Sequence, residues 1–324
     1  MFYEIGIKSL LAEDGFLCFI TPKFWMLNLE DEGMRQFFED KLNFRFISLC
    51  NPFESVVTEN TIVLFKQDNS KQSEIDVYRY DKKKSFQKIL PLNLSYCSSN
   101  LHKEWIVGMD KPLINLLTKL SKHKKLKEIS SSKRGAEISK KVLRNTNNGV
   151  PALIGQDMKR YIITWNNTFM DKKHKEYKRL ASFFCSNIIY LRRVDICLEA
   201  TLSNKEYAYN KNVYGIRVDE RSGFLTKYIL ALLNSNVLNF YYKKKFSTKK
   251  EDVFPEIQTY LYEQLPIPFA DKLQQQAIVD IVDEILLLKE KDATKDTSIL
   301  ENTINRQVYA LFNLSGEEIK IVEG

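Results

Sequence analysis

The chain has 324 residues, 44% of them hydrophobic, and a formal net charge of +8 at pH 7. This length has room for two domains with their own cores. The sequence has neither a membrane-length apolar run nor a basic-then-apolar signal peptide, so we expect a cytoplasmic protein with no membrane partner. The five cysteines and three histidines lie singly, without the spacing of a zinc site, so we expect reduced thiols and no metal.

The first region, residues 1–107, has the pattern of an α/β fold. Residues 2–12 are predicted to be helical and to end at the turn dipeptide Asp14-Gly15. The continuous apolar run Phe16–Ile20 predicts a strand buried on both faces of a parallel sheet. A helical stripe follows (Met34, Phe37, Phe38, Leu42), and then three strands are expected (44–51, 60–67, 75–80). We therefore expect a partial doubly wound sheet, with residues 81–107 as an irregular linker.

The second region, residues 108–268, changes to a mixture of helices and short strands. A helix is expected around Leu113–Leu120, and strands are expected at 187–194 and 214–218. The long apolar pattern of 224–245 predicts a single helix. We expect an α+β domain here, followed by a helical hairpin in residues 269–324.

Positive charge is concentrated in three places. The segment Lys119–Arg144 holds ten lysines and arginines and only two glutamates, a balance of +8 that equals the net charge of the chain. Smaller clusters lie at 172–179 and 243–250. Concentrated positive charge favours a polyanionic partner, because each phosphate contact releases counterions. The alternative is an ordinary solvated, lysine-rich surface.

Several stretches resemble one known family in their order along the chain. "FYEIGIKSLLAEDGFLCFITPKFW" and "NPFESVVTENTIVLF" resemble the back half of an adenine-N6 DNA methyltransferase domain. "SSKRGAEISKK", "PALIGQDMKRYIITW", "NIIYLRRV", "YGIRV" and "LPIP" resemble the TaqI-type specificity domain, also called the target-recognition domain, that follows it. "LENTINRQVYALFNLSGEEIKIVEG" resembles the end of the fused restriction-modification enzymes of type IIG. The resemblance implies recognition of double-stranded DNA for a type II restriction enzyme or methyltransferase.

The loops that carry the family's chemistry are not found in the sequence. In the family, a Gly-rich loop binds S-adenosylmethionine and an Asn-Pro-Pro-Tyr or Asp-Pro-Pro-Tyr loop holds the target amine. The one Asn-Pro dipeptide, Asn51-Pro52, is followed by Phe53, and no G-x-G loop is present. None of the three Glu-x-Lys triplets follows a strand bearing Pro-Asp, as a nuclease site requires. We expect no catalytic residue and no cofactor in this chain; S-adenosylmethionine belongs to the complete enzyme that the resemblance implies.

The resemblance also implies residues that contact DNA. Phe53 occupies the position of the aromatic side chain that stacks on a flipped adenine, although a core position under the loop is the alternative. Base reading requires donors in a groove, whereas lysines fix position on phosphates. The predicted DNA-binding residues are Lys133, Arg134, Lys140, Lys141, Arg160, Tyr161, Arg192, Arg193, Lys243, Lys244, Lys245, Lys249 and Lys250.

Two functions remain open at this stage. The first is DNA recognition for an adenine-N6 methyltransferase or a fused restriction-modification enzyme, with this chain as a fragment or a separate subunit. The second is a free-standing nucleic-acid-binding protein without any enzymatic association. If Phe16–Ile20 is a parallel strand, one of its edges lacks a neighbour from this chain. We then expect this open edge to pair with the methyltransferase N-terminal half or with a second copy of the chain. The alternative is that residues 1–107 form a reduced sheet whose N-terminal helix folds across the exposed edge.

Overall fold

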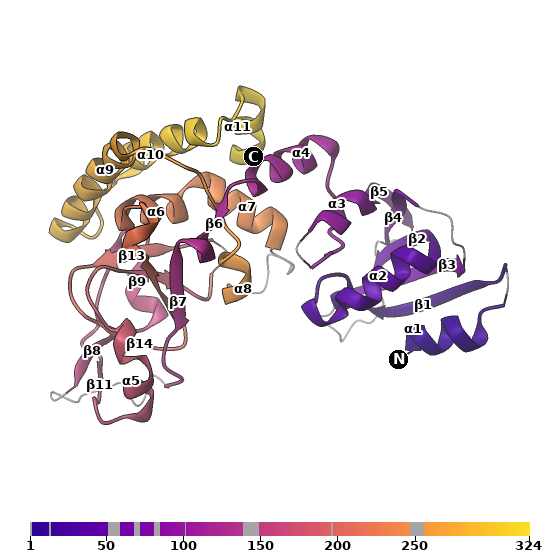
Figure 1. Ribbon diagram of the computed structural model, residues 1–324, viewed down its shortest axis with the longest axis horizontal. Helices are drawn as coiled ribbons and strands as arrows, with labels where there is room; N and C mark the ends of the chain where they lie inside the picture. Colours follow the sequence, from indigo (N-terminus) through magenta and orange to yellow (C-terminus); the bar gives the residue numbers. More distant parts are fainter. Residues whose placement is uncertain are drawn as a thin grey trace. The chain divides into compact units, whose positions relative to one another are not determined.

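The computed structural model describes residues 2–12, 14–50, 59–67, 72–80, 85–100, 102–138, 149–195, 197–246 and 256–324. The chain divides into two compact units, Met1–Asn115 and Leu116–Gly324, here called unit 1 and unit 2 (Figure 1). The division lies close to the predicted boundary after residue 107. The C-terminal helices, in contrast, group with unit 2 instead of forming a segment of their own.

Unit 1 is built on a sheet of five described strands. Their order is β1 (Phe16–Pro22), β3 (Asn60–Gln67), β2 (Leu42–Cys50), β4 (Glu74–Tyr80) and β5 (Phe86–Asn93). β2 and β4 form the parallel pair, and the other neighbours are antiparallel. The predicted linker 81–107 therefore contains a strand, β5, and a short helix, α3 (Leu94–Ser99).

The prediction of a parallel strand buried on both faces at Phe16–Ile20 is wrong. β1 pairs antiparallel with β3, and exposure alternates along it, with Phe16 59% and Ile20 46% exposed. Leu17 and Phe19 point to the core side, where they join the core cluster of unit 1. The apolar run has the composition of a central strand, but β1 lies at the edge of the sheet, where one of its faces is open.

The helices of unit 1 that the structure describes cover one face of this sheet. Tyr3 of α1 (Phe2–Ile5) and Phe38 of α2 (Glu32–Lys41) have ring centroids 5.1 Å apart, and Phe38 also contacts Phe44 of β2 at 5.6 Å. A π-helical turn, Gly6–Leu10, continues α1. A doubly wound sheet carries helices on both faces, so the described residues form a mixed α/β layer structure and not the doubly wound sheet that we predicted.

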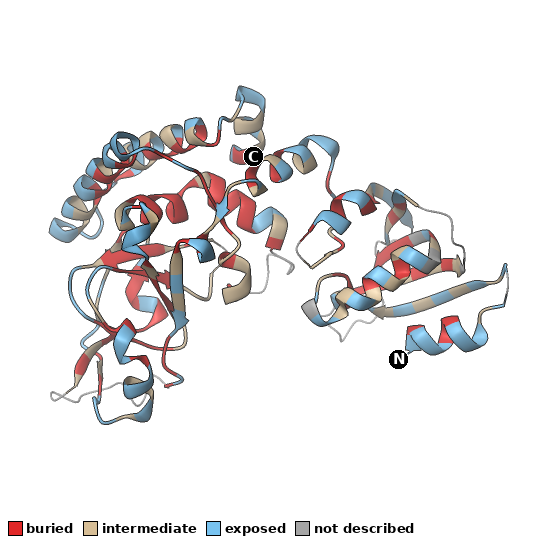
Figure 2. Ribbon diagram, in the orientation of Figure 1, coloured by how far each residue is buried: buried red, intermediate tan, exposed pale blue. Residues whose placement is uncertain are grey.

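Unit 2 contains a four-stranded antiparallel sheet of order β13, β12, β15, β7. These strands are β13 (Ala200–Ser203), β12 (Ile188–Arg192), β15 (Val213–Val218) and β7 (Ser130–Arg134). The central strands β12 and β15 are almost fully buried (Figure 2). Smaller described sheets join β11 (Phe169–Met170), β8 (Val150–Leu153) and β14 (Ala208–Tyr209); β10 (Ile162–Ile163) and β9 (Met158–Lys159); and β16 (Pro266–Ile267) and β6 (Lys124–Lys125).

The predicted helix 224–245 is two helices, and the first of them packs against the sheet. α6 (Thr226–Asn234) ends at Ser235, whose extended backbone (ψ 154°) separates it from α7 (Asn236–Phe246). The expected C-terminal hairpin consists of α9 (Lys272–Lys291) and α10 (Ser298–Leu311), with a third helix, α11 (Gly316–Glu323). Three further described helices of the chain are α4 (Lys111–Ser121), α5 (Lys175–Leu180) and α8 (Thr259–Tyr262). None of the helices in the described part of the chain is long and apolar enough to span a membrane.

Candidate nucleic-acid interface

Three separate segments of unit 2 meet in a surface that we call the basic end. They are residues 133–138 after β7, residues 171–179 around α5 (Lys175–Leu180), and residues 209–213 between β14 and β15 (Figure 1). Together they carry eight lysines and arginines against three carboxylates. The fold thus brings together lysines and arginines from three separate segments at the basic end, among them Lys133 and Arg134 of the basic run.

The backbone explains why residues 134–138 lie against residues 209–213. The N–H of Gly135 donates to the carbonyl of Val213 at 2.9 Å, and the N–H of Ala136 donates to the carbonyl of Tyr209 at 2.8 Å. A Cβ atom on Gly135 would lie 2.2 Å from the carbonyl oxygen of Asn210. Only glycine allows the two backbones to approach this closely.

A carboxylate holds two basic side chains at the centre of this surface. Glu137 lies 3.3 Å from Nη2 of Arg134 and 2.9 Å from Nζ of Lys211. Arg134 also donates from Nε to the carbonyl of Lys211 at 3.2 Å. The hydrogen bond from Lys211, with the charge of Arg134 in support, lowers the pKa of the Glu137 carboxyl. Glu137 is therefore ionised at neutral pH and orients both cations.

The helix α5 contributes the rest of the positive charge. It begins at His174, whose Nδ1 accepts from the N–H of Glu176 at 3.2 Å. Glu176 also accepts from the N–H of Glu137 at 3.3 Å and from Arg179 at 2.8 Å. The exposed basic residues of this segment are Lys172, Lys173, Lys175, Lys178 and Arg179. Glu176 thus ties the helix to the segment after β7.

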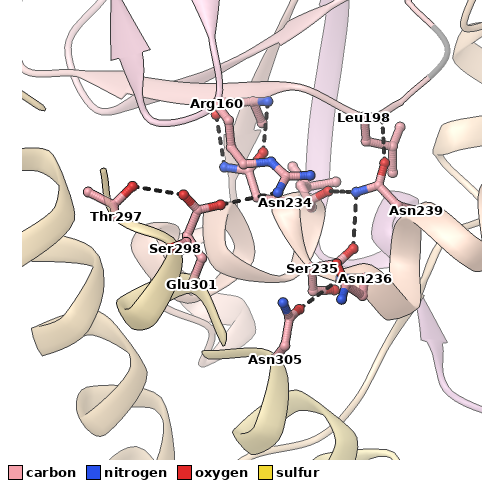
Figure 3. Close-up of polar contacts among 12 residues, drawn as sticks. Arg160, Leu198, Asn234, Ser235, Asn236, Asn239, Thr297, Ser298, Glu301 and Asn305 are labelled. Atoms are coloured by element: carbon pink, nitrogen blue, oxygen red, sulfur yellow. Dashed lines mark hydrogen bonds and ion pairs between the residues drawn. The ribbon is translucent and has the colours of Figure 1, made fainter. Parts of the chain in front are cut away.

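Two of the predicted DNA-binding residues, Arg160 and Tyr161, make internal contacts, and those of Arg160 are shown in Figure 3. Arg160 pairs with Glu301 of α10 at 3.1 Å, and Glu301 also accepts from the Thr297 hydroxyl at 2.8 Å. Tyr161 has φ +62° and is 3% exposed, with its N–H bonded to the carbonyl of Ala200. Burial raises the pKa of its phenol. Tyr161 thus lies in a buried turn, and Arg160 connects that turn to the C-terminal helix α10.

The paired arginines at the end of β12 are also neutralised locally. Arg192 lies 3.2 Å from Asp195 and 3.1 Å from Glu199. Arg193 forms an ion pair with Glu256, and its main chain bonds to Asn212 and Ile257. Both side chains are partly buried. Their carboxylate partners reduce the positive charge that is available to attract a phosphate.

The remaining predicted residues divide into exposed ones and ones that the structure does not describe. Lys133 is exposed beside Arg134, and Lys243 and Lys244 are exposed at the end of α7. Lys245 lies over the ring of Tyr241, 5.4 Å from its centroid. Phe53, Lys140, Lys141, Lys249 and Lys250 lie outside the described residues, so the structure does not test their predicted roles.

A cleft of about 1280 Å³ lies elsewhere in unit 2, between the sheet and α9. Arg217, Asn187 and Ser131 are among its lining residues. Four cations and three carboxylates line it, namely Lys127, Arg217, Arg221, Lys227, Glu128, Asp219 and Glu220. This near balance contrasts with the basic end, where positive charge is in clear excess. A polyanion is therefore better matched by the basic end.

Sequence reasoning missed two parts of the basic end. Lys211 was not singled out because it stands alone in a polar turn, and only the fold brings it to Glu137. The cluster at 172–179 was noted as charged but left out of the predicted interface. Its charge density was the available signal, but its nearness to Arg134 depends on tertiary contacts such as the one from Glu176 to Glu137.

Residues 150–267, which lie in unit 2, match the family model of the TaqI-like C-terminal specificity domain. The comparison with curated proteins found no match. Among solved structures, the type IIL restriction-modification enzyme MmeI in complex with DNA matches 99% of this chain and 49% of its own, at 11% identity and a TM-score of 0.57. The type IIG restriction endonuclease BpuSI matches 95% and 48%, at 11% identity and a TM-score of 0.40. A type I S subunit from M. genitalium matches 53% and 40%, at 16% identity and a TM-score of 0.38.

The likeness to MmeI shows a shared fold, and the resemblance to a TaqI-type specificity domain that we predicted from the sequence is confirmed by the family match over residues 150–267. The chain spans about half the length of the first two of these structures. A specificity domain is a sequence-recognition domain, so the match supports DNA recognition in general terms.

Proposed function

We propose that unit 2 binds duplex DNA through the basic end and recognises a DNA sequence for a restriction-modification enzyme. The family match to a specificity domain carries this proposal. The excess of exposed lysines and arginines on one surface supports it, since phosphate contacts supply most of the affinity of proteins for DNA.

The test is the salt dependence of duplex binding by the full chain, followed by fluorescence anisotropy of a labelled duplex. Four exposed lysines of the basic end, Lys133, Lys172, Lys173 and Lys178, are changed together to Ala. The slope of log K against log salt should become shallower by about 0.9 for each phosphate contact that is lost. The affinity should fall for every duplex tested.

A matched control separates local contact from total charge. Four exposed lysines elsewhere in unit 2, Lys205, Lys272, Lys291 and Lys320, are changed to Ala, which removes the same charge. This control should leave the slope within error of the unchanged chain. An equal loss in both variants would mean that the basic end is not the interface.

We also propose that unit 1 associates with the cofactor-binding half of an adenine-N6 DNA methyltransferase. The support is chemical: β1 is an edge strand, and Phe16 and Ile20 stand exposed beside an edge without a neighbour in the described sheet. Such an edge invites pairing with another strand. The residues of this chain do not fit S-adenosylmethionine, because the sequence contains no G-x-G loop. The cofactor and the methyl transfer therefore belong to the proposed partner.

Hydrogen exchange along residues 16–22 tests the association. Exchange should be fast in the monomeric chain and should slow when a polypeptide carrying the methyltransferase half is added. The chain alone should not transfer methyl groups from S-adenosylmethionine. Slow exchange in a demonstrably monomeric sample, or methyl transfer by protein free of host enzymes, would contradict the proposal.

A further inference from the structure

The guanidinium of Arg134 is held in one orientation at the basic end. Its Nε donates to the carbonyl of Lys211 at 3.2 Å, and its Nη2 lies 3.3 Å from the Glu137 carboxylate. Among the described residues no partner is found for Nη1, and 42% of the side chain is exposed. One edge of the guanidinium is therefore bound by the protein, while the Nη1–Nη2 end keeps N–H donors for a ligand.

The Glu137 carboxylate helps to decide what kind of ligand this is. A carboxylate beside an arginine opposes a phosphate by charge repulsion and lowers the local positive potential. The carboxylate repels the edge of an uncharged base much less than it repels a phosphate. Such a base also gains from guanidinium N–H donors whose orientation is already fixed. Lys133 on the same strand has no carboxylate partner among the described residues, as a simple phosphate contact would require.

We propose that Arg134 is a specificity-determining residue that reads a guanine in the major groove, and that Glu137 is its positioning residue. This inference rests on the proposed DNA recognition by unit 2. Guanine presents two acceptors, O6 and N7, at the spacing of the two guanidinium donors. The carbonyl of Lys211 and the Glu137 carboxylate fix the plane of the fork, and Gly135 allows the backbone approach that brings them there.

The experiment begins by selecting preferred duplexes from a random library with the full chain. Each guanine of the preferred sequence is then replaced in turn by 7-deazaguanine, which lacks the N7 acceptor. For the unchanged chain, replacement at one guanine should weaken binding about fivefold or more, the lower range for a good bidentate contact. Replacement at the other guanines should have smaller effects.

Two variants connect this effect to the named residues. Arg134→Lys keeps the charge but removes the fork, so it should bind the guanine and 7-deazaguanine duplexes alike. Glu137→Gln should lower the ratio of preferred to scrambled binding while it strengthens binding to scrambled duplex, because a repulsive charge is removed. If Glu137 only repelled phosphate, the variant would strengthen binding to preferred and scrambled duplexes alike, and the ratio would not fall.

Two control variants complete the design. Lys133→Ala should weaken all duplexes equally and leave the 7-deazaguanine effect in place. Arg221→Lys alters an arginine outside the basic end, which pairs with Asp219 at 3.4 Å, and should leave selectivity unchanged. Thermal denaturation of each variant confirms that it is folded.

The results separate failure of this inference from failure of the proposed function. If Arg134→Lys keeps the 7-deazaguanine effect, or if Arg134→Ala weakens all duplexes equally and flattens the salt slope by about one contact, Arg134 binds phosphate and the inference is overturned. A preferred sequence without guanine overturns it too. If the unchanged chain binds no duplex, the proposed function itself fails.

Discussion

β1 of unit 1 and β12 of unit 2 have similar apolar sequences but different surroundings. "FLCFI" in β1 alternates between exposed and half-buried residues, whereas "IIYL" in β12 is buried throughout. β12 lies between β13 and β15, and β1 lies at an edge with one neighbour. The apolar composition of a strand thus indicates that its side chains are suited to burial. Its position in the sheet decides whether other residues of the same chain bury them.

This difference bears on how each unit is completed. In unit 2, α6 of the same chain packs against β12, β13 and β15, and residues 228–234 of this helix are buried. In unit 1, Phe16 and Ile20 keep apolar surface in contact with water. Exposed apolar surface beside an open strand edge is typical of an interaction site.

The largest expected effect comes from truncating one isoleucine in each strand. Ile189→Ala in β12 removes a fully buried side chain and should lower the free energy of unfolding by about 2–5 kcal/mol, since it leaves a cavity. Ile20→Ala in β1 removes a side chain that is 46% exposed and should cost less than about 1.5 kcal/mol. Chemical denaturation of the two variants measures both values. A cost at Ile20 equal to that at Ile189 would show that β1 is buried in the isolated chain.

A second comparison uses two arginines with internal partners. Arg35 of unit 1 is fully buried and donates to four carbonyls, those of Trp25, Asn28, His102 and Lys103. Arg35→Met leaves these acceptors without a donor, so the loss should be at least about 3 kcal/mol. Arg160 of unit 2 is partly exposed and pairs with one carboxylate, so Arg160→Met should cost about 1 kcal/mol or less.

The two losses are measured by chemical denaturation, with hydrogen exchange assigning each loss to its unit. Arg35→Lys serves as the control for charge, and it should recover little because the single ammonium cannot reach four carbonyls. Equal losses for Arg35→Met and Arg160→Met would contradict the larger contribution to stability that we expect from the four hydrogen bonds of Arg35.

A third comparison uses two glycines. Gly135→Ala in unit 2 places a Cβ atom 2.2 Å from the carbonyl oxygen of Asn210 and should cost about 1–3 kcal/mol through backbone displacement. Gly33→Ala in α2 of unit 1 meets nothing within 4 Å and should stabilise by up to about 1 kcal/mol. Thermal denaturation gives the two signs. A Gly135→Ala variant with unchanged stability would contradict the close approach of the two backbones at the basic end.

Much of the fold could be predicted from hydrophobic periodicity. Strands at 60–67 and 75–80 and the helix around Leu113–Leu120 are observed within a few residues of the prediction. The direction and the neighbours of strands were not predictable, because the antiparallel pairing of β1 with β3 joins residues that are 38 to 50 positions apart in the sequence. Ser235 ends α6 by its backbone conformation, and an apolar pattern that continues through it conceals such a break.

The candidate site was less predictable than the fold. Charge density located the segment that contains Lys133 and Arg134, because local clusters persist in the folded chain. The side-chain partners of arginines come from distant segments, as Glu301 does for Arg160. Tertiary structure therefore decides whether an arginine is paired with a carboxylate. The sequence pattern near the arginine does not predict that partner.

The smallest expected effect compares two carboxylates of unit 2 as pH changes. Burial, with the charge of Asp195 in support, raises the pKa of Glu199, and Arg192 opposes the shift. The folded state then binds this proton more tightly than the unfolded state, so stability is lost as pH rises from the ordinary pKa of 4.5 through the raised value. Glu137 has the opposite shift, so its contribution is present above 4.5 and is lost as pH falls below it.

The variants Glu199→Gln and Glu137→Gln test these signs. Their unfolding free energies are measured between about pH 3 and pH 7, the range in which a carboxyl group titrates. Relative to the unchanged chain, Glu199→Gln should gain a few tenths of a kcal/mol as pH rises, because the partly buried charge is absent. Glu137→Gln should lose stability relative to the unchanged chain at neutral pH and approach it in acid. The same direction of change in both variants would mean that the surroundings of the two carboxylates do not differ as their contacts indicate.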